Sequence, residues 1–338
     1  MPLPAPFDRL RLPVIGSPLF IASGPELVIA QCKAGIIGSF PALNARPSGV
    51  FDEWLHRITE ELAVHDRDHP DHPAAPFAVN QIVHKSNNRL DEDMEVCARW
   101  KVPMVITSLG AREDVNKAVQ DWGGIVLHDV IDVRFARKAI EKGANGLIPV
   151  AAGAGGHAGT LSPFALMQEI RAWFDGPIAL SGAIACGRSI LAAQAMGADF
   201  AYIGTPWIAT HEANAVDPYK QAILDGAGSD IHYTNLFTGV HGNYLRPSII
   251  AAGLEPDNLP PSDPSKLNFG SGGNMEFKVW KDIWASGQGI GVIDAIESVA
   301  ARVDRLESEY RRAIAALGPN NSGRYWRTPL ANPDMVQQ

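Results

Sequence analysis

A glycine-rich segment with a single histidine is the part of this sequence best suited to chemistry. Residues 151–159 read AAGAGGHAG and place His157 among residues too small to crowd a ligand laid over them. Glycines let the backbone turn tightly and approach a flat ligand closely, at an entropic cost. An imidazole beside such a ligand can exchange a proton with it near neutral pH. The alternative is a glycine-rich turn with a surface histidine, because a glycine motif alone is a weak signal.

Two other short segments have the composition of a phosphate-binding turn. Ser181-Gly182-Ala183 and Gly204-Thr205 each end a short apolar run, and a helix start at Cys186-Gly187-Arg188 follows the first of them. Small residues expose backbone N–H groups, a helix N-terminus adds positive potential, and Thr205 offers a hydroxyl. Arg188 is a candidate source of charge. Ordinary turns between strands and helices remain the alternative.

These segments belong to a series of eight short apolar runs that alternate with helical patterns. The predicted strands are Val14–Phe20, Gly35–Leu43, Phe77–Ile82, Val102–Leu109, Gly123–Val130, Gly146–Ala152, Pro177–Gly182 and Phe200–Thr205. Their near-continuous apolar character is typical of parallel strands covered by helices. Eight such units close into a barrel, so the sequence predicts an α/β fold of the (β/α)₈ TIM-barrel type. The alternative is an open doubly wound sheet, whose phosphate-binding glycines normally follow the first strand, where this chain has Pro18 to Ile21.

The chain is longer than a barrel requires, since a TIM barrel takes about 250 residues. We predict a barrel domain over residues 1–212 and 285–320, with an inserted, largely irregular or helical cap over 213–284 after the eighth strand. A long amphipathic helix is expected over Val292–Leu317, and residues 321–338 form a C-terminal tail. The apolar face of that helix is compatible with a homodimer and equally compatible with cover by the barrel.

Composition argues against several classes of function. The net charge is −8 and the sequence pI about 5.7, which disfavours binding to nucleic acid. No run approaches the length of a membrane span, and the first residues lack the apolar core of a signal peptide. The three cysteines are far apart and odd in number, which suits a reducing compartment. We therefore expect a cytoplasmic protein that acts on a small molecule.

Taken together, the motifs resemble one family. The segment from Gly153 to Gly159, the two small-residue turns, Phe77-Ala78-Val79-Asn80 and Ser286-Gly287-Gln288-Gly289 resemble motifs of the nitronate monooxygenase (2-nitropropane dioxygenase) family of FMN-dependent TIM-barrel oxidoreductases. The resemblance runs from about Leu12 to Leu317. It implies non-covalently bound FMN and an active-site histidine, which is His157 here. The cofactor-binding residues it implies are Ser17, Pro18, Leu19, Asn80, His128, Ala154, Gly155, Gly156, Ser181, Gly182, Ala183, Gly204, Thr205 and Gln288.

The activity implied by the resemblance is the oxidation of a small carbon acid, such as an alkyl nitronate, with O₂. His157 acts there either as general base or as a group that orients the substrate. The alternative within the family is an NAD(P)H-dependent reductase of quinones, activated alkenes or enoyl thioesters. Outside it, the same turns suit a barrel isomerase or aldolase acting on a phosphorylated sugar, or a protein that binds a phosphorylated ligand without turnover.

Three departures from the family pattern bear on the chemistry. The first strand ends in Gly16-Ser17-Pro18-Leu19 and lacks the usual glutamine and methionine, and Gly182-Ala183 replaces a Gly-Gly turn. The fifth strand ends in His128-Asp129, where some relatives place a lysine after the histidine. A cation there stabilises negative charge on a reduced flavin, and Asp129 opposes it unless a protonated His128 compensates. The cofactor class is thus better supported than the substrate class.

Other residues have both a functional and a structural interpretation. The segment from His65 to His72 is rich in metal-ligand types, but its prolines favour a solvated loop, and we predict no metal site. Trp280 and Trp284 either wall the pocket or pack in a helix core. The insertion residues Tyr233, His241, Tyr244 and Arg246 are candidates for substrate contact.

Overall fold

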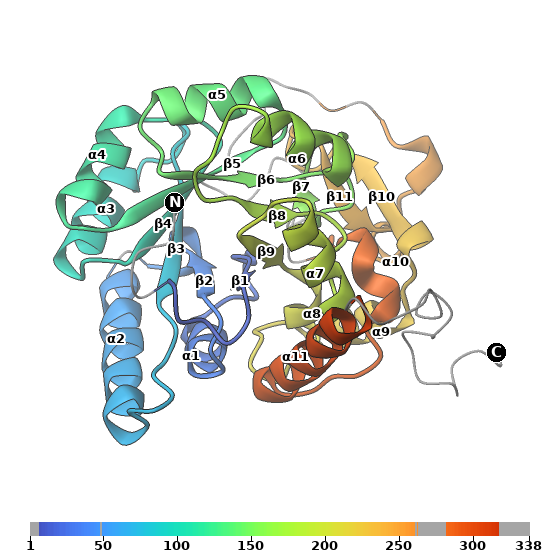
Figure 1. Cartoon of the computed structure of the whole chain (residues 1–338). Helices are drawn as coiled ribbons and strands as arrows, with labels where there is room; N and C mark the ends of the chain where they lie inside the picture. Colours follow the sequence, from blue (N-terminus) through green and yellow to red (C-terminus); the bar gives the residue numbers. More distant parts are fainter. Residues whose placement is uncertain (1–6, 48, 261, 263–281, 318–338) are drawn as a thin grey trace.

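A closed ring of eight parallel strands forms the centre of the computed structural model, which describes residues 7–47, 49–260, 262 and 282–317 (Figure 1). The barrel strands are β1 (Val14–Gly16), β2 (Gly38–Pro41), β3 (Phe77–Ile82), β4 (Met104–Ser108), β5 (Ile125–Val130), β6 (Gly146–Pro149), β8 (Ala179–Ser181) and β9 (Phe200–Ile203). Pairing runs from β2 to β6 and through β1, β9 and β8, and the bridges Ile15–Ile37 and Leu147–Ile178 join the two sheets. The ring excludes the open doubly wound sheet and confirms the TIM barrel.

Helices surround the strands on the outside. They are α1 (Pro25–Lys33), α2 (Val50–Asp68), α3 (Leu90–Arg99), α4 (Glu113–Asp121), α5 (Val133–Glu141), α6 (Pro163–Arg171), α7 (Gly187–Ala195) and the short α8 (Thr205–Ile208). Gly35, Gly143 and Gly197 follow α1, α5 and α7 closely, and all three adopt a positive φ. A helix commonly ends at a left-handed residue of this kind, and glycine adopts it without a steric penalty.

The observed strands are shorter than the apolar runs that predicted them. The first run was expected to be a strand as far as Phe20, but β1 stops at Gly16. Ser17 to Phe20 leave the sheet and line a cavity instead. Apolar character therefore predicted where each strand lies but not where it ends, because loop residues that face a cavity are apolar too.

Side chains alternate between two apolar layers, and this alternation decides which residues reach the barrel mouth. Leu127 belongs to the cluster inside the barrel, whereas Val126 and Val130 belong to the cluster between strands and helices. All three lie on β5, where successive side chains point to opposite faces. Asp129 therefore shares the inner face with Leu127, and His128 shares the outer face with Val126 and Val130.

The insertion after the eighth barrel strand contains both helices and strands. Its described elements are α9 (Asp217–Asp225), β10 (Ile231–Thr234), β11 (Gly242–Leu245) and α10 (Arg246–Ala251). Strand β11 pairs with β10 and with β7 (Gly156–His157), so a small antiparallel sheet joins the insertion to the glycine-rich segment. The sequence did not indicate these strands. The tail predicted over 321–338 lies outside the described residues, and the domain boundaries stay a prediction.

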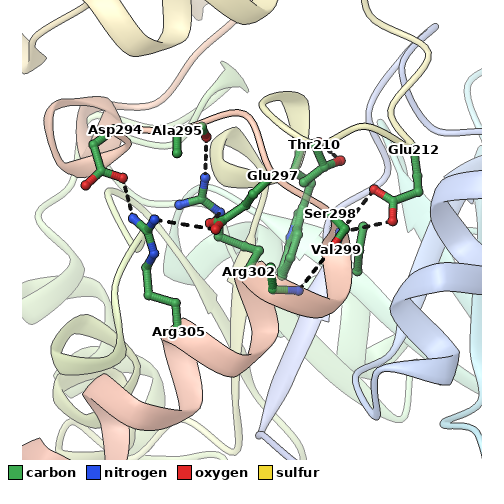
Figure 2. Close-up of polar contacts among 11 residues, drawn as sticks. Thr210, Glu212, Asp294, Ala295, Glu297, Ser298, Val299, Arg302 and Arg305 are labelled. Carbon is green, nitrogen blue, oxygen red and sulfur yellow. Dashed lines mark hydrogen bonds and ion pairs between the residues drawn. The ribbon is translucent and has the colours of Figure 1, made fainter.

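The last helix begins later than its periodicity suggested. Helix α11 spans Val299–Ala316, not Val292–Leu317, and a short 3₁₀ helix covers Gln288–Val292. Before α11, the backbone of Glu297 bonds to Ala209 and His211 rather than to the next helical turn. Figure 2 shows the Glu212 carboxylate accepting from the Val299 N–H at 3.0 Å, close to the Ser298 N-cap. Tertiary bonds thus override the helical pattern of residues 292–298.

A buried arginine fixes the same junction. Arg302 is 2% exposed, forms an ion pair with Glu297 at 2.8 Å and donates to the Ala295 carbonyl at 2.7 Å (Figure 2). Arg305 contacts Asp294 and Glu297 from the next turn. Buried charges are tolerated when they are paired in this way. The two arginines therefore hold the start of α11 against residues 294–297, the segment that precedes the helix.

The barrel covers the apolar face of α11. Val299, Val303 and Leu306 are buried, and the helix packs against α7 and α1. Ile314 and Leu317 stay exposed at its end. The homodimer remains a prediction. Among the described helices, none is long and apolar enough to cross a membrane.

Candidate active site

A large cavity opens at the carboxyl ends of the barrel strands, where TIM-barrel enzymes place their sites. Its volume is about 820 Å³, which lies in the range of small-molecule and cofactor sites. Every site residue predicted from the sequence lines this cavity, except Gln288. The lining members are Ser17, Pro18, Leu19, Asn80, His128, Ala154, Gly155, Gly156, His157, Ser181, Gly182, Ala183, Gly204 and Thr205. Gln288 lies behind the wall, where its backbone N–H donates to the Gly153 carbonyl at 2.8 Å.

The glycine-rich segment packs too tightly to accept side chains at two positions. A Cβ on Gly155 would lie 2.8 Å from the backbone nitrogen of Gly287. Gly156 has a φ of +69°, which other residues adopt only with strain. The glycines thus let the glycine-rich segment pass close to the backbone of residues 286–289. The opposite side of the glycine-rich segment faces the cavity.

The insertion is hydrogen-bonded to the glycine-rich segment through backbone pairing and two side chains. Besides the β7–β11 pairing, Asn243 Nδ2 donates to the Ala154 carbonyl at 2.6 Å, and the Tyr233 hydroxyl donates to the Ala158 carbonyl at 2.9 Å. Tyr233 also stacks on His241, with ring centroids 5.1 Å apart. These contacts fix the backbone on both sides of His157.

His157 faces the cavity and is oriented by the insertion. Its Nε2 lies 2.8 Å from Thr238 Oγ1, and Thr238 Oγ1 lies 3.0 Å from the Val240 carbonyl. A carbonyl only accepts, so the hydroxyl proton goes to Val240 and Nε2 donates to Thr238. Desolvation by burial lowers the pKa of His157 to about 4. At neutral pH the ring is therefore uncharged and held in one tautomer.

The ends of β8 and β9 converge on a neutral pocket suited to an anion. Thr205 Oγ1 accepts from the Gly287 N–H at 2.9 Å, which leaves the hydroxyl proton to be donated to a ligand. Gly182 and Ala183 both have a positive φ, and Ala183 N donates to the Gly153 carbonyl at 3.2 Å. Arg188 does not line the cavity. Backbone N–H groups and hydroxyls are thus the donors at this end.

The end of β5 places ionisable side chains at the other part of the wall. Burial raises the pKa of Asp129 to about 6, against the lowering effect of bonds from Ser108 and the Leu109 N–H. His128 points to the helix side, where Thr107 Oγ1 lies 2.7 Å from its Nδ1, and desolvation lowers its pKa to about 4. The hypothesis that a protonated His128 compensates Asp129 is therefore wrong near neutral pH.

Several lining residues were not found from the sequence. They include Ser108 at the end of β4, Leu109 directly after it, Tyr202 on β9, and Tyr219 and Thr238 in the insertion. Single hydroxyl residues in strands and loops do not recur at a characteristic spacing, so the sequence does not reveal which of them line a cavity. Tyr202 alone could have been predicted, because it lies two positions after the inward-facing Phe200 and therefore points to the same side of the strand. Of the insertion candidates, Tyr233 and His241 line the cavity, whereas Tyr244 and Arg246 do not.

The remaining candidates take structural positions. Trp284 lies outside the cavity wall and stacks on Tyr219 with ring centroids 5.1 Å apart, and it is not in a helix. Trp280 lies outside the described residues. The segment from His65 to His72 is partly helical, because α2 continues to Asp68. Within the described residues, no group of three His, Cys, Asp or Glu side chains could hold a metal ion.

Comparison with known proteins decides the family. The nitronate monooxygenase family model matches residues 74–308, well over half of the chain. The chain belongs to the nitronate monooxygenase family. The matched region contains β3 to β9, the glycine-rich segment and the whole of the described insertion. The chain is therefore a flavin-dependent oxidoreductase, as the family's enzymes are.

Individual relatives are distant and differ in activity. A nitronate monooxygenase of Paraburkholderia phytofirmans is 24% identical, over 92% of this chain and 96% of its own. A (3aS,4S,5R,7aS)-5-hydroxy-7a-methyl-1-oxo-octahydro-1H-indene-4-carboxyl-CoA dehydrogenase of Rhodococcus jostii is 22% identical, over 90% and 94%. Among solved structures, a nitroalkane oxidase of Streptomyces ansochromogenes matches with a TM-score of 0.76 and 22% identity, covering 92% of this chain and 99% of that one. The structural match supports the barrel fold.

Proposed function

We propose that this protein binds FMN and oxidises small alkyl nitronates with O₂. The observation that carries the proposal is the placement of His157: an uncharged imidazole, fixed in one tautomer, beside a bed of glycines that lines the cavity. The glycines leave room for a flat ring, and the imidazole stands where a small substrate would meet that ring. Family membership supports the flavin, and the cofactor's identity as FMN rests on the phosphate-binding character of the β8–β9 end.

The residues present fit a phosphorylated flavin. A Cβ on Gly204 would lie 2.6 Å from Ser17 Oγ, so the loops that carry Gly204 and Ser17 approach each other as closely as a glycine allows. Thr205, Ser181 and the turn at Gly182 would hold the phosphate through hydroxyl and backbone donors, and Asn80 and Ala154 to Gly156 would face the ring. When bound, the flavin supplies the electron transfer between substrate and O₂. The protein supplies position, desolvation and proton control.

The role of His157 depends on the form of the substrate. A nitroalkane must lose its α-proton, and a neutral imidazole is the form that can accept it. A nitronate is already an anion and needs no base. His157 would orient it by a charge-assisted hydrogen bond in its protonated form, which becomes populated as the pH falls toward the pKa of about 4. In both cases Thr238 keeps Nε2 occupied, so the ring keeps its orientation while the substrate is exchanged.

Substitution of His157 tests this role. We expect His157→Ala to retain flavin and to lose about 10²–10⁴-fold in kcat/KM, the usual contribution of a general acid or base. His157→Gln serves as the matched variant that keeps a polar side chain but cannot carry a proton. Full activity of His157→Ala with both nitroalkanes and nitronates would reject the proposal.

The pH profile separates the two roles. If His157 is the base, kcat/KM for a nitroalkane falls as the pH drops through the pKa of about 4, because protonation removes the accepting nitrogen. If His157 orients the anion, kcat/KM for a nitronate rises as the pH falls toward that pKa, because the cationic form binds it better. Both slopes should vanish in His157→Gln, and a profile unchanged by the substitution would exclude both roles.

A second candidate is an NAD(P)H-dependent reductase of activated alkenes, including enoyl thioesters. Two observations favour it: the carboxyl-CoA dehydrogenase among the relatives, and the open side of the cavity, where exposed Ile131, Phe135 and Lys138 line the wall. An apolar strip ending in a cation suits a long acyl thioester with an anionic carrier.

One anaerobic experiment discriminates the two candidates. Rapid bleaching of the bound flavin by NADH or NADPH indicates the reductase, whereas bleaching by a nitronate alone indicates the oxidase. The absorption spectrum of the purified protein comes first, with identification of the chromophore released by heat. A colourless protein that does not bind added FMN would reject both candidates and favour a barrel enzyme acting on a phosphorylated sugar.

A further inference from the structure

Asp129 is a carboxyl group inside the barrel mouth that the proposed chemistry does not use. Among the described residues that line the cavity, it is the only Asp or Glu. It lies on the inner face of β5, where it is paired with Ile148 of β6. Burying a charged side chain costs free energy unless hydrogen bonds stabilise it, and such groups are concentrated at functional sites.

The surrounding backbone and side chains are arranged to hold this carboxyl. Ser108 and the Leu109 N–H both donate to it. Ser108 Oγ in turn accepts from Asn80 Nδ2 at 2.7 Å, so a chain of donors runs from Asn80 through Ser108 to Asp129. Leu109 has a φ of +62°, a strained conformation for a branched residue. Such strain collects at functional sites, and here the strained residue supplies one of the two donors.

No cationic side chain of the described residues contributes to the pKa of Asp129. The other titratable groups that line the cavity are His84, His128, Lys138, His157, Tyr202, Tyr219, Tyr233 and His241. His128 points outward and is uncharged near neutral pH, and His157 is uncharged as well. Burial, together with the nearby charge of Asp129, raises the pKa of Tyr202 well above its usual value, so the phenol keeps its proton. Within the described chain, burial is the dominant influence on the Asp129 carboxyl, and no cation contributes to its pKa.

We propose that Asp129 takes up a proton when the bound flavin is reduced, and so keeps the net charge of the cavity constant. This inference rests on the proposed function, in that a flavin must occupy the cavity. Two electrons from an external reductant such as dithionite enter the site, one proton binds to the flavin, and a second binds to an Asp129 carboxylate oxygen. Two added negative charges are thus matched by two protons, with no lysine needed at this position.

The physical reason is the low dielectric of the site. A reduced flavin that stays anionic beside an ionised carboxylate would place two like charges in a desolvated cavity, which strongly raises the pKa of one of them. Asp129 is already poised near neutrality, with a pKa of about 6. A modest further rise therefore suffices to protonate it at neutral pH.

Infrared difference spectroscopy of the flavin-loaded enzyme tests this directly. At about pH 8, above the pKa of about 6 that burial gives Asp129, reduction should produce the C=O stretch of a protonated carboxylic acid. The band should shift in protein labelled with [¹³C]aspartate and should be lost in Asp129→Asn. An indicator dye should show that Asp129→Asn takes up one proton fewer per flavin reduced. The exposed Asp121→Asn on α4 is the matched control and should behave as the wild type.

The outcomes are distinct. Absence of the carboxylic acid band in wild-type enzyme that binds and reduces flavin overturns the inference and leaves the proposed function intact. Persistence of the band and of full proton uptake in Asp129→Asn also overturns it. Failure of the wild type to bind any flavin overturns the proposed function itself. If Asp129→Asn does not fold, the isotope-labelled wild type still decides, and Ser108→Ala should shift the band because it removes one of the donors.

Discussion

The two ends of the cavity differ in the kind of polar group that they present to a charged ligand. At the β8–β9 end, the described donors are backbone N–H groups and the Thr205 hydroxyl, and Arg188 stays off the wall. At the β5 end, the wall carries an ionisable carboxyl, Asp129, with an uncharged His128 behind it. The first end offers fixed dipoles to a ligand anion, and the second offers a site where a proton can be added or removed.

This difference indicates how the two ends tolerate change. Fixed backbone donors need close approach and special φ values, so they depend on glycine and on small residues. The pKa of a buried titratable group depends on burial and on a few hydrogen-bond donors, so the other neighbouring residues can vary. Its protonation then responds to the charge of the bound ligand. We expect substitutions at the glycine-rich side to affect retention of the flavin, and substitutions at the β5 side to affect its redox behaviour.

The largest structural effect is expected for Gly155→Ala. The new Cβ would meet backbone atoms of Ser286 and Gly287 at 2.8 Å, and backbone cannot rotate away as a flexible side chain can. We expect a loss of about 1–3 kcal/mol of unfolding free energy, typical of overpacking, together with weaker flavin binding. Urea unfolding and equilibrium dialysis measure the two quantities.

Gly49→Ala is the matched control for that variant. Gly49 has a φ of −57°, and a Cβ there would have no atom within 4 Å. If Gly155→Ala kept both the stability and the flavin affinity of Gly49→Ala, the close approach of the glycine-rich segment to residues 286–287 would have no functional importance.

The same contrast explains how much the sequence could predict. Eight apolar runs predicted the barrel. The glycine-rich end of the site could be predicted because glycines and small residues in such a cluster have few other structural roles. Asp129 and His128 were both noticed, but the face of β5 on which each lies was not predicted. Asp129 shares the inner face with Leu127 and His128 shares the outer face with Val126, although both residues line the cavity. Thr238 could not be predicted at all, because its contact with His157 spans 81 positions and depends on how the insertion folds back.

Thr205→Ala should weaken flavin binding by about tenfold, the effect of losing one hydrogen bond to a charged group. The hydroxyl accepts from Gly287 and has one proton left for a ligand anion. Thr205→Ser keeps the hydroxyl and should restore the affinity. The dissociation constants come from titration of the apoprotein with FMN, followed by fluorescence.

Riboflavin provides the control for this variant, since it lacks the phosphate. If Thr205 contacts the phosphate, Thr205→Ala should bind riboflavin as well as the wild type does. An equal loss for FMN and riboflavin would place the phosphate elsewhere and would remove the distinction between the two ends of the cavity.

The smallest effect is expected for Ala183→Gly. Ala183 has a φ of +53°, a left-handed conformation that costs a non-glycine residue roughly 1–2 kcal/mol. Glycine removes that cost but adds about 0.4–1 kcal/mol of entropy to the unfolded chain. The net change should be a stabilisation below about 1 kcal/mol in urea unfolding, with little change in flavin affinity. The control Ala118→Gly in α4, at an ordinary helical position, should instead destabilise by about 1 kcal/mol. Equal losses in the two variants would mean that the turn after β8 is not strained, and that its alanine is as well accommodated as the glycines beside it.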